Sequence, residues 1–335
     1  MGNQEIIFNE NPEDEIISSL NTGNFIRAFK LSEDWLKSIP LEAKLSFDSQ
    51  LAKQAFLLTR HLYNKQERLN IIQDHREKAN FSRKILEQMI QISHSNEKIK
   101  SPIPALTDSR VWQTIHFILH SLIANSLAKV LAGQKAYKLD HEEIIQLATS
   151  LIFTGNWKAS ADALNFLLNV NRQNATAHLL QSYVSYSLHD ETNFYIELRE
   201  AFFIQPDVIK GNWHFLPGGI FTHFWDEVQA LNLGVSRSYR EYALLLELNN
   251  IYKIKREITQ HEFEQFKTQF QTLYRNYVEN GSNNHDVKPR LLHLLCWIID
   301  YVVLIKDYDL LENYRDIMIE LDNESWQLYN AIMNK

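Results

Sequence analysis

Cysteine, glycine and proline are scarce in this sequence of 335 residues, and each shortage limits the fold. Cys296 is the only cysteine, so no disulfide can form within the chain. The 9 glycines and 7 prolines are too few for the many tight turns of an all-β protein. Strand-like alternation is absent, and every strong apolar pattern recurs at three- and four-residue spacing. We therefore predict an all-α protein, long enough to bury a sizeable core without cross-links.

Sequence patterns that identify common functions are also missing. No GxxxxGK, GxGxxG or GxSxG pattern occurs, and no cysteine set has zinc spacing, so we predict no catalytic residue, cofactor or metal ion. The net charge is −7 without a basic run, which argues against nucleic acid as a partner. No signal-peptide core is present, and no apolar run approaches the roughly 18 residues of a membrane span. We expect a cytoplasmic protein without membrane insertion, although a secreted effector without a signal peptide would share these features.

Two helical hairpins between Glu142 and Pro206 have the clearest pattern in the chain. Each contains two amphipathic helices, and Pro206 ends the last of them because proline cannot continue a helix. Gly155 and Asn156 separate the helices of the first hairpin, where a left-handed residue is needed. His189 occupies the corresponding place in the second hairpin. The distance between the two turns is 34 residues (189 − 155).

A period of 34 residues is that of the tetratricopeptide repeat, and both hairpins resemble this family. The family has small residues where its two helices cross, and Ala148, Ser182, Ser160 and Ala201 match these positions. Other positions depart from the pattern: Phe194 and Leu167 are large, and Arg172 replaces the closing proline that Pro206 supplies in the second copy. The repeats are therefore degenerate, and they cover about a fifth of the chain. The resemblance implies a TPR-like solenoid of helical hairpins, here with irregular flanking helices.

The resemblance also implies a binding surface for a protein or peptide. In the family, the first helices of successive hairpins line a groove that accepts a peptide. Carried over position by position, the groove residues are Ile145, Thr149, Ile152, Phe153, Leu179, Tyr183 and Tyr186. This face is apolar and aromatic, so it requires a cover, either a partner or the protein's own helices. The alternative in which the chain fills its own groove stays open.

The remaining segments are predicted to be helical as well. A third degenerate hairpin is expected over 14–40, with its turn at Gly23 and Asn24. One helix is predicted to end near Tyr63 and a long charged helix to run from Asn64 to His94. The segment 95–109 contains two prolines and is the best linker. Further helices are expected over 236–253, 259–278, 289–305 and 307–321, with a short closing helix from Glu324. We divide the chain into an N-terminal helical region (1–100), central repeats (101–210) and a C-terminal helical region (211–335).

Three groups of residues have a chemical interpretation and a structural one. His116 and His120 have the i, i+4 spacing of metal ligands, but their apolar surroundings favour buried, hydrogen-bonded histidines. Cys296 lies in an apolar helix, which favours a buried thiol over a nucleophile. His214 and His223 flank a Pro-Gly-Gly break rich in aromatic residues, which favours packing over a small-molecule pocket.

We therefore expect a scaffold or adaptor that binds a protein or peptide. One alternative is a ligand-sensing regulator that acts through another protein. A second alternative is an enzyme of unfamiliar type centred on the aromatic junction of His214 and His223.

Overall fold

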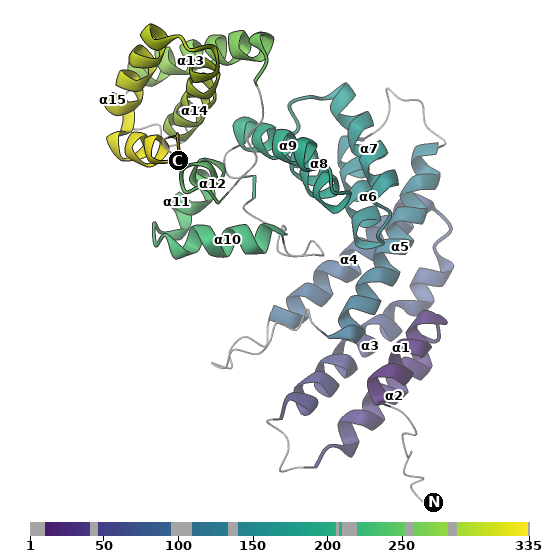
Figure 1. The fold of residues 1–335 in the computed structure, drawn as a ribbon. Helices are drawn as coiled ribbons and strands as arrows, with labels where there is room; N and C mark the ends of the chain where they lie inside the picture. Colours follow the sequence, from purple (N-terminus) through teal and green to yellow (C-terminus); the bar gives the residue numbers. More distant parts are fainter. Residues whose placement is uncertain are drawn as a thin grey trace, which may run out of the picture. The chain divides into compact units, whose positions relative to one another are not determined.

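The structure, a computed structural model, describes residues 11–40, 46–94, 109–132, 140–205, 208–209, 220–251, 258–280 and 287–333. All regular secondary structure in these ranges is helical, so the predicted all-α class is confirmed. Figure 1 shows the helices with their labels. The chain divides into two compact units, residues 1–160 and 161–335, here called the N-terminal and C-terminal units. This division falls inside the proposed central region 101–210, and the three regions stay a prediction.

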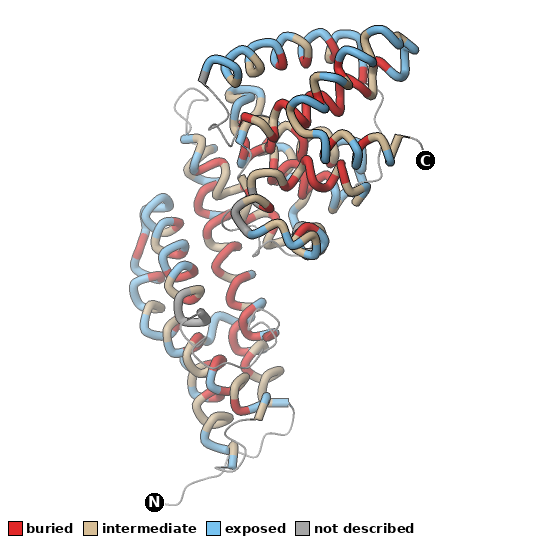
Figure 2. Tube along the Cα trace, turned by 90° about the vertical axis from the view of Figure 1, so that its left-hand side faces the viewer, coloured by how far each residue is buried: buried red, intermediate tan, exposed pale blue. Residues whose placement is uncertain are grey.

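The N-terminal unit is a bundle of helices that pack against their neighbours in the chain. Its helices are α1 (Pro12–Asn21), α2 (Phe25–Ser38), α3 (Phe47–Ile71), α4 (His75–His94), α5 (Arg110–Ala132) and α6 (His141–Phe153). α5 is the central helix, since it packs on α1, α4 and α6. Helices α1 to α5 each bury apolar residues in a common core that includes Ile16, Leu58, Met89 and Ile115, and Leu147 of α6 packs against it. Figure 2 shows buried residues along one side of many helices and exposed residues along the other.

The break between α3 and α4 lies later than the sequence predicts. α3 continues through Tyr63 and Asn64 to Ile71, and α4 begins at His75. The Asp74 carboxylate accepts the Glu77 amide at 2.7 Å and so caps α4. Polarity rises at Asn64 because the outer face of α3 becomes charged, and the helix does not end there. The predicted boundary was wrong for this reason.

By length and composition, one helix of the described residues could cross a membrane. This is α5, whose most apolar window has a mean hydropathy of 1.4 and is 44% buried. A core helix of a bundle passes the same test, and α5 packs on α1, α3, α4 and α6 of its unit. The absence of membrane insertion therefore stays a prediction.

The C-terminal unit has α12 at its centre, with helices on several sides. Its helices are α8 (Ala175–Ser187), α9 (Glu191–Ile204), α10 (Ile220–Ala230), α11 (Val235–Arg240), α12 (Tyr242–Leu248), α13 (Gln260–Asn280), α14 (Val287–Ile305) and α15 (Tyr308–Met333), while α7 (Trp157–Val170) crosses the boundary between the units. α8 packs along α9, and α14 contacts both α13 and α15. α12 contacts α9, α14 and α15, so this short helix joins the α8–α9 hairpin to the last three helices.

Of two predictions about helix boundaries in this unit, one is wrong and one is confirmed. The single helix expected over 236–253 is wrong: α11 ends at Arg240, and α12 ends at Leu248. Asn250 has a positive φ of 52°, which ends the helix because asparagine adopts this left-handed conformation more readily than most residues. The short closing helix is confirmed by a kink inside α15 at Asp322, whose carboxylate accepts the amides of Glu324 and Ser325.

α14 is the most enclosed helix among the described residues. Every residue from Leu291 to Ile299 is buried, so the helix is covered on all sides over this length. Its apolar neighbours come from α12, α13 and α15, and they include Leu248, Phe266 and Met318. Cys296 is fully buried here, and burial raises the pKa of its thiol. The prediction of a buried structural thiol is confirmed.

Four helical hairpins in the structure share one turn design. A residue with positive φ follows the first helix, and an Asn or Asp then precedes the second helix. The positive-φ residues are Gly23, Gly155, His189 and Lys306, and the residues that follow them are Asn24, Asn156, Asp190 and Asp307. In each turn the positive-φ amide donates to the carbonyl three residues back, and the next amide donates to the carbonyl five residues back. These two bonds satisfy carbonyl groups that the helix end leaves without partners.

The Asn or Asp of each turn starts the second helix. The side chains of Asn24, Asp190 and Asp307 accept an amide three residues later at 3.1 Å. At the remaining turn the Asn156 carbonyl accepts the Ser160 amide. The predicted turns at Gly23, Gly155 and His189 are confirmed.

Small residues lie where the hairpin helices meet, as the repeat pattern predicts. The Ser160 hydroxyl at the start of α7 donates to the Ala148 carbonyl of α6 at 2.9 Å. Ala28, Ser182 and Ala201 are also fully buried. A larger side chain at these positions would force the helices apart.

Candidate functional site

The predicted groove residues belong to two units, and each set is described within its own unit. Ile145, Thr149, Ile152 and Phe153 lie on α6 of the N-terminal unit. Ile152 is fully buried in the core, while the other three are half-buried. The Thr149 hydroxyl donates to the Ile145 carbonyl at 2.8 Å, so its hydrogen bond is made within α6. Their role in binding a peptide stays a prediction.

Phe153 packs on the two histidines of α5. Its ring stacks on His120 with a centroid distance of 4.0 Å and an interplanar angle of 2°, and it lies 6.0 Å from His116. The Trp112 ring also packs against His116, with 4.1 Å between the two ring centroids. The Ser150 hydroxyl of α6 lies 3.2 Å from His120 Nδ1. Phe153 is therefore a contact between α5 and α6 as well as a predicted groove residue.

The two histidines are buried in their neutral form. Burial lowers the pKa of His116 to about 4 and that of His120 to about 3, and the nearby His116 adds to the second shift. His116 Nε2 is buried without a hydrogen-bond partner in the described part of the chain. No group of three or more His, Cys, Asp or Glu side chains within the described ranges is arranged to hold a metal ion. The predicted burial of both histidines is confirmed, and the absence of a metal ion stays a prediction.

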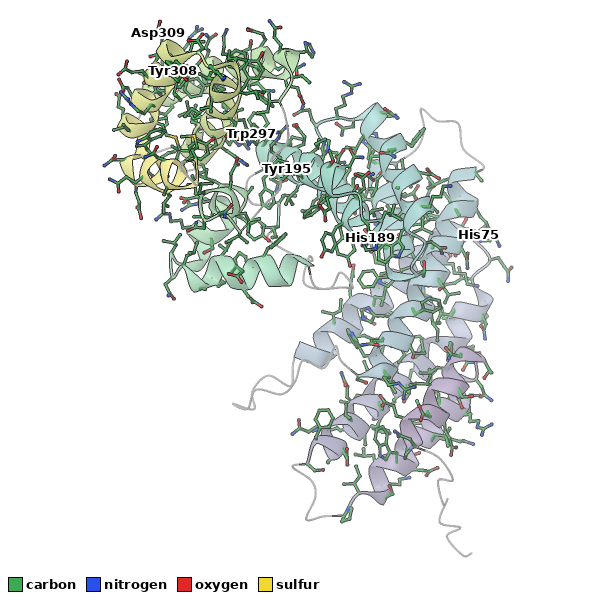
Figure 3. The ribbon with its side chains drawn as sticks, viewed as in Figure 1. His75, His189, Tyr195, Trp297, Tyr308 and Asp309 are labelled. Atoms are coloured by element: carbon green, nitrogen blue, oxygen red, sulfur yellow. The ribbon has the colours of Figure 1, made fainter. Side chains whose placement is uncertain are left out.

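The α8 members of the predicted set differ in exposure. Leu179 and Tyr183 are buried, and Tyr183 is 2% exposed. Burial raises the pKa of the Tyr183 hydroxyl. Tyr186, one turn further along α8, is 42% exposed and touches Phe194 of α9 edge-on at 5.3 Å. Leu188 and His189, which follow α8, are exposed as well, and Figure 3 labels His189 at this end. Tyr186 and Leu188 form an accessible apolar surface, here called the α8 end.

Because Tyr183 is buried and Tyr186 is exposed, we expect different effects on stability when each is replaced by Ala. Replacing Tyr183 by Ala should lower the free energy of unfolding by about 3–5 kcal/mol, as deletion of a packed aromatic ring does. Replacing Tyr186 by Ala should cost less than about 1 kcal/mol, since nearly half of this side chain is already in water. Urea denaturation of both variants beside the wild type measures the difference. An unchanged stability for Tyr183→Ala would show that its ring is a binding surface and does not belong to the core.

A hydrogen-bonded histidine also joins α8 to α9. His178 Nδ1 lies 2.5 Å from a Glu197 carboxylate oxygen, and Nε2 lies 3.0 Å from the Arg172 carbonyl. Burial lowers the pKa of His178, but the hydrogen bonds to Glu197 and to Arg172 outweigh it, so the pKa is raised overall. This pair stabilises the hairpin most when His178 is charged. The contribution is therefore lost as the pH rises through the raised pKa.

A polar network that the sequence analysis missed lies between α9, α12 and α14. Glu247 of α12 accepts from His293 Nε2 at 2.7 Å and from Trp297 Nε1 at 3.3 Å. The Arg199 guanidinium of α9 is 4.1 Å from the Trp297 ring centroid and 5.1 Å from that of Phe266. Arg199, His293 and Trp297 are all buried. Figure 3 labels Trp297 of this network together with Tyr195 of α9, which lines a small pocket beside Arg199 and Glu247.

This network holds three helices together by charge as well as by packing. A buried carboxylate is stable only when hydrogen bonds replace its water, and Glu247 has two such donors. The network could not be predicted because Arg199, Glu247 and His293 are far apart in the sequence and match no motif. The only signal in the sequence was the presence of charged residues inside apolar runs, such as Glu247 in the run that α12 buries.

A second accessible apolar surface lies where α14 turns into α15. Val303, Leu304, Ile305 and Tyr308 all fall within the six positions 303–308, and they are between 44% and 72% exposed. Figure 3 labels Tyr308 and Asp309 at this turn. We call these four residues the α14–α15 tip. Like the α8 end, it is a hairpin end at which apolar side chains meet water.

The aromatic junction of His214 and His223 cannot be assigned an arrangement. His214 lies outside the described residues, and for His223 only the backbone position in α10 is described. Trp225, further along α10, stacks on Tyr242 at 6.2 Å. The enzyme alternative centred on these histidines stays a prediction.

Comparison with known proteins adds no further assignment. No family model, no curated protein and no solved structure matches this chain.

Proposed function

We propose that the chain is a scaffold that binds a protein or peptide through TPR-like helical hairpins. The observation that supports this most is the turn design shared by four hairpins, two of them 34 residues apart. Proteins built from repeated helical hairpins use their extended surfaces to bind other chains. The buried small residues Ala148, Ser160, Ser182 and Ala201 support the same relationship.

The α8 end is the accessible part of the predicted groove in the C-terminal unit. Tyr186 and Leu188 expose apolar surface there, and tyrosine is enriched among residues that contribute most to binding. Leu179 and Tyr183 of the same helix are buried, and Tyr186 itself packs edge-on against Phe194 of α9. A peptide with apolar anchors matches this chemistry, because burying exposed apolar side chains is the main driving force of such binding.

Selection of random peptides displayed on phage tests the proposal with the full chain as bait. Enriched peptides should contain apolar or aromatic anchors, and fluorescence anisotropy should give a dissociation constant for each synthetic copy. Tyr186→Ala should weaken binding by about tenfold or more, which corresponds to at least about 1.4 kcal/mol.

Leu304→Ala on the α14–α15 tip is the matched control, since it removes a similarly exposed apolar side chain. This variant should bind the selected peptides like the wild type. Failure to enrich any peptide would contradict the scaffold proposal. Enriched peptides that depend on Leu304 and ignore Tyr186 would contradict the placement of the groove.

A further inference from the structure

A second pocket in the C-terminal unit concentrates positive charge. Its basic lining residues are Arg240 of α11, and Arg290 and His293 of α14. The apolar side of the pocket includes Phe202, Phe203 and Leu244. None of its lining residues carries a carboxylate. The carboxylate of Glu247, outside the lining, lies 2.7 Å from His293 Nε2, so the two arginines are the main source of positive charge at the pocket.

Arg240 has an unused hydrogen-bond donor at this pocket. Its Nε atom is buried and has no hydrogen-bond partner among the described residues. Nearly all buried donors in proteins have a partner, because the hydrogen bonds lost with water are otherwise not replaced. Its neighbour on α11, Arg237, is instead paired with Glu241 at 2.8 Å. Arg240 therefore differs from a surface arginine because its Nε atom is buried and lacks an acceptor among the residues that the structure describes.

Arg290 and His293 are held in place by their own contacts. Arg290 donates from Nη2 to the Ile204 carbonyl at 2.7 Å, which fixes its guanidinium beside the end of α9. The imidazole of His293 is oriented by Glu247 on one side and by Trp297, 4.3 Å away, on the other. Arg290 also lies in the first turn of the 19-residue helix α14. The positive end of the α14 dipole therefore adds to the field.

We propose that this pocket binds a small organic oxyanion, in which a phosphate or carboxylate group meets Arg240, Arg290 and His293. Arginine suits both groups because its planar fork of N–H donors matches two oxygen atoms of one anion. The wall formed by Phe202, Phe203 and Leu244 would contact the organic part of the ligand. The enclosed space of the pocket is about 10 Å³, room for about one water-sized group, so an oxygen atom of the anion would enter it and the organic part would lie at its mouth.

Isothermal titration calorimetry with three probes tests this site on the full chain. The probes are inorganic phosphate, phenyl phosphate and benzoate, each compared with sodium chloride at equal ionic strength. Phenyl phosphate should bind more tightly than inorganic phosphate if the aromatic wall contributes. Comparison with benzoate distinguishes a phosphate site from a carboxylate site.

Arg240→Gln should raise the dissociation constant of the tightest-binding probe at least tenfold, and Arg240→Lys should recover part of the lost affinity. Arg237→Gln is the matched control, because it removes an arginine of the same short helix outside the pocket. Circular dichroism checks that each variant is folded, and Arg290→Gln replaces Arg240→Gln if the latter unfolds. The proposal is overturned if none of the probes binds beyond the chloride control. It is equally overturned if Arg237→Gln weakens binding as much as the pocket variant does.

Discussion

Trp297→Ala is expected to destabilise the C-terminal unit by about 3–5 kcal/mol, the usual cost of deleting a packed aromatic ring. The ring is 2% exposed, and the substitution removes more than apolar contact. It takes away one of the two donors to Glu247 and the ring beneath the Arg199 guanidinium. A buried charge that loses its partners is strongly destabilising, so the upper part of this range is expected. Thermal unfolding should show a fall of roughly 10 °C or more, at about 2–4 °C per kcal/mol for a unit of this size.

Leu304→Ala is the control for this experiment as well. Leu304 lies on the same helix as Trp297 but is exposed at the α14–α15 tip, so its removal should change stability by less than about 0.5 kcal/mol. Equal effects of the two substitutions would contradict the arrangement of α12, α13 and α14 around Trp297.

Acidification from pH 7 to pH 5 is expected to destabilise the N-terminal unit through His116 and His120. Both groups have folded pKa values, about 4 and about 3, that lie below the ordinary value of 6.5. The unfolded chain therefore binds more protons than the folded one across this interval, and stability falls as the pH falls. Below pH 6.5, each histidine lowers the free energy of unfolding by about 1.4 kcal/mol per pH unit. At pH 5 the pair should therefore have lowered it by on the order of 4 kcal/mol.

The double variant His116→Gln/His120→Gln separates this effect from the titration of carboxylates. The glutamines of the variant do not titrate. Carboxylates in ion pairs, such as Glu143 with Arg76, are the same in both proteins and titrate equally. Urea denaturation at several pH values should therefore give a much shallower slope between pH 7 and pH 5 for the variant. Parallel slopes for the variant and the wild type would show that the histidines are accessible to protons in the folded state.

The hairpin architecture could be predicted because local residues determine it. Gly23 and Gly155 stand at positions that need a positive φ, and glycine adopts this conformation without a steric cost. The turn at Lys306 has the same geometry, yet lysine gives no such signal. There the apolar spacing on each side predicted the hairpin, and the following Asp307 supplied the cap. The broken helix at 236–253 was missed because apolar spacing continues through Tyr242 and Leu248 while the backbone turns.

The candidate sites were less predictable than the fold, because they depend on contacts between distant helices. Periodicity placed Ile152 and Tyr183 on helix faces correctly, but it did not show that those faces are buried. The Arg240 pocket and the Glu247 network both combine residues from α9, the α11–α12 segment and α14. Their chemistry exists only after these helices have packed, so no local pattern in the sequence marks it.

The complete burial of α14 has a consequence for how the protein folds during synthesis. Leu291 to Ile299 leaves the ribosome as an apolar helix with no solvated face, and α15 emerges only afterwards. Until α15 docks, this helix must pack on α12 and α13 alone or be protected by a chaperone. Completion of the C-terminal unit thus requires the synthesis of α15, and a ribosome that stalls within α15 would leave an aggregation-prone nascent chain.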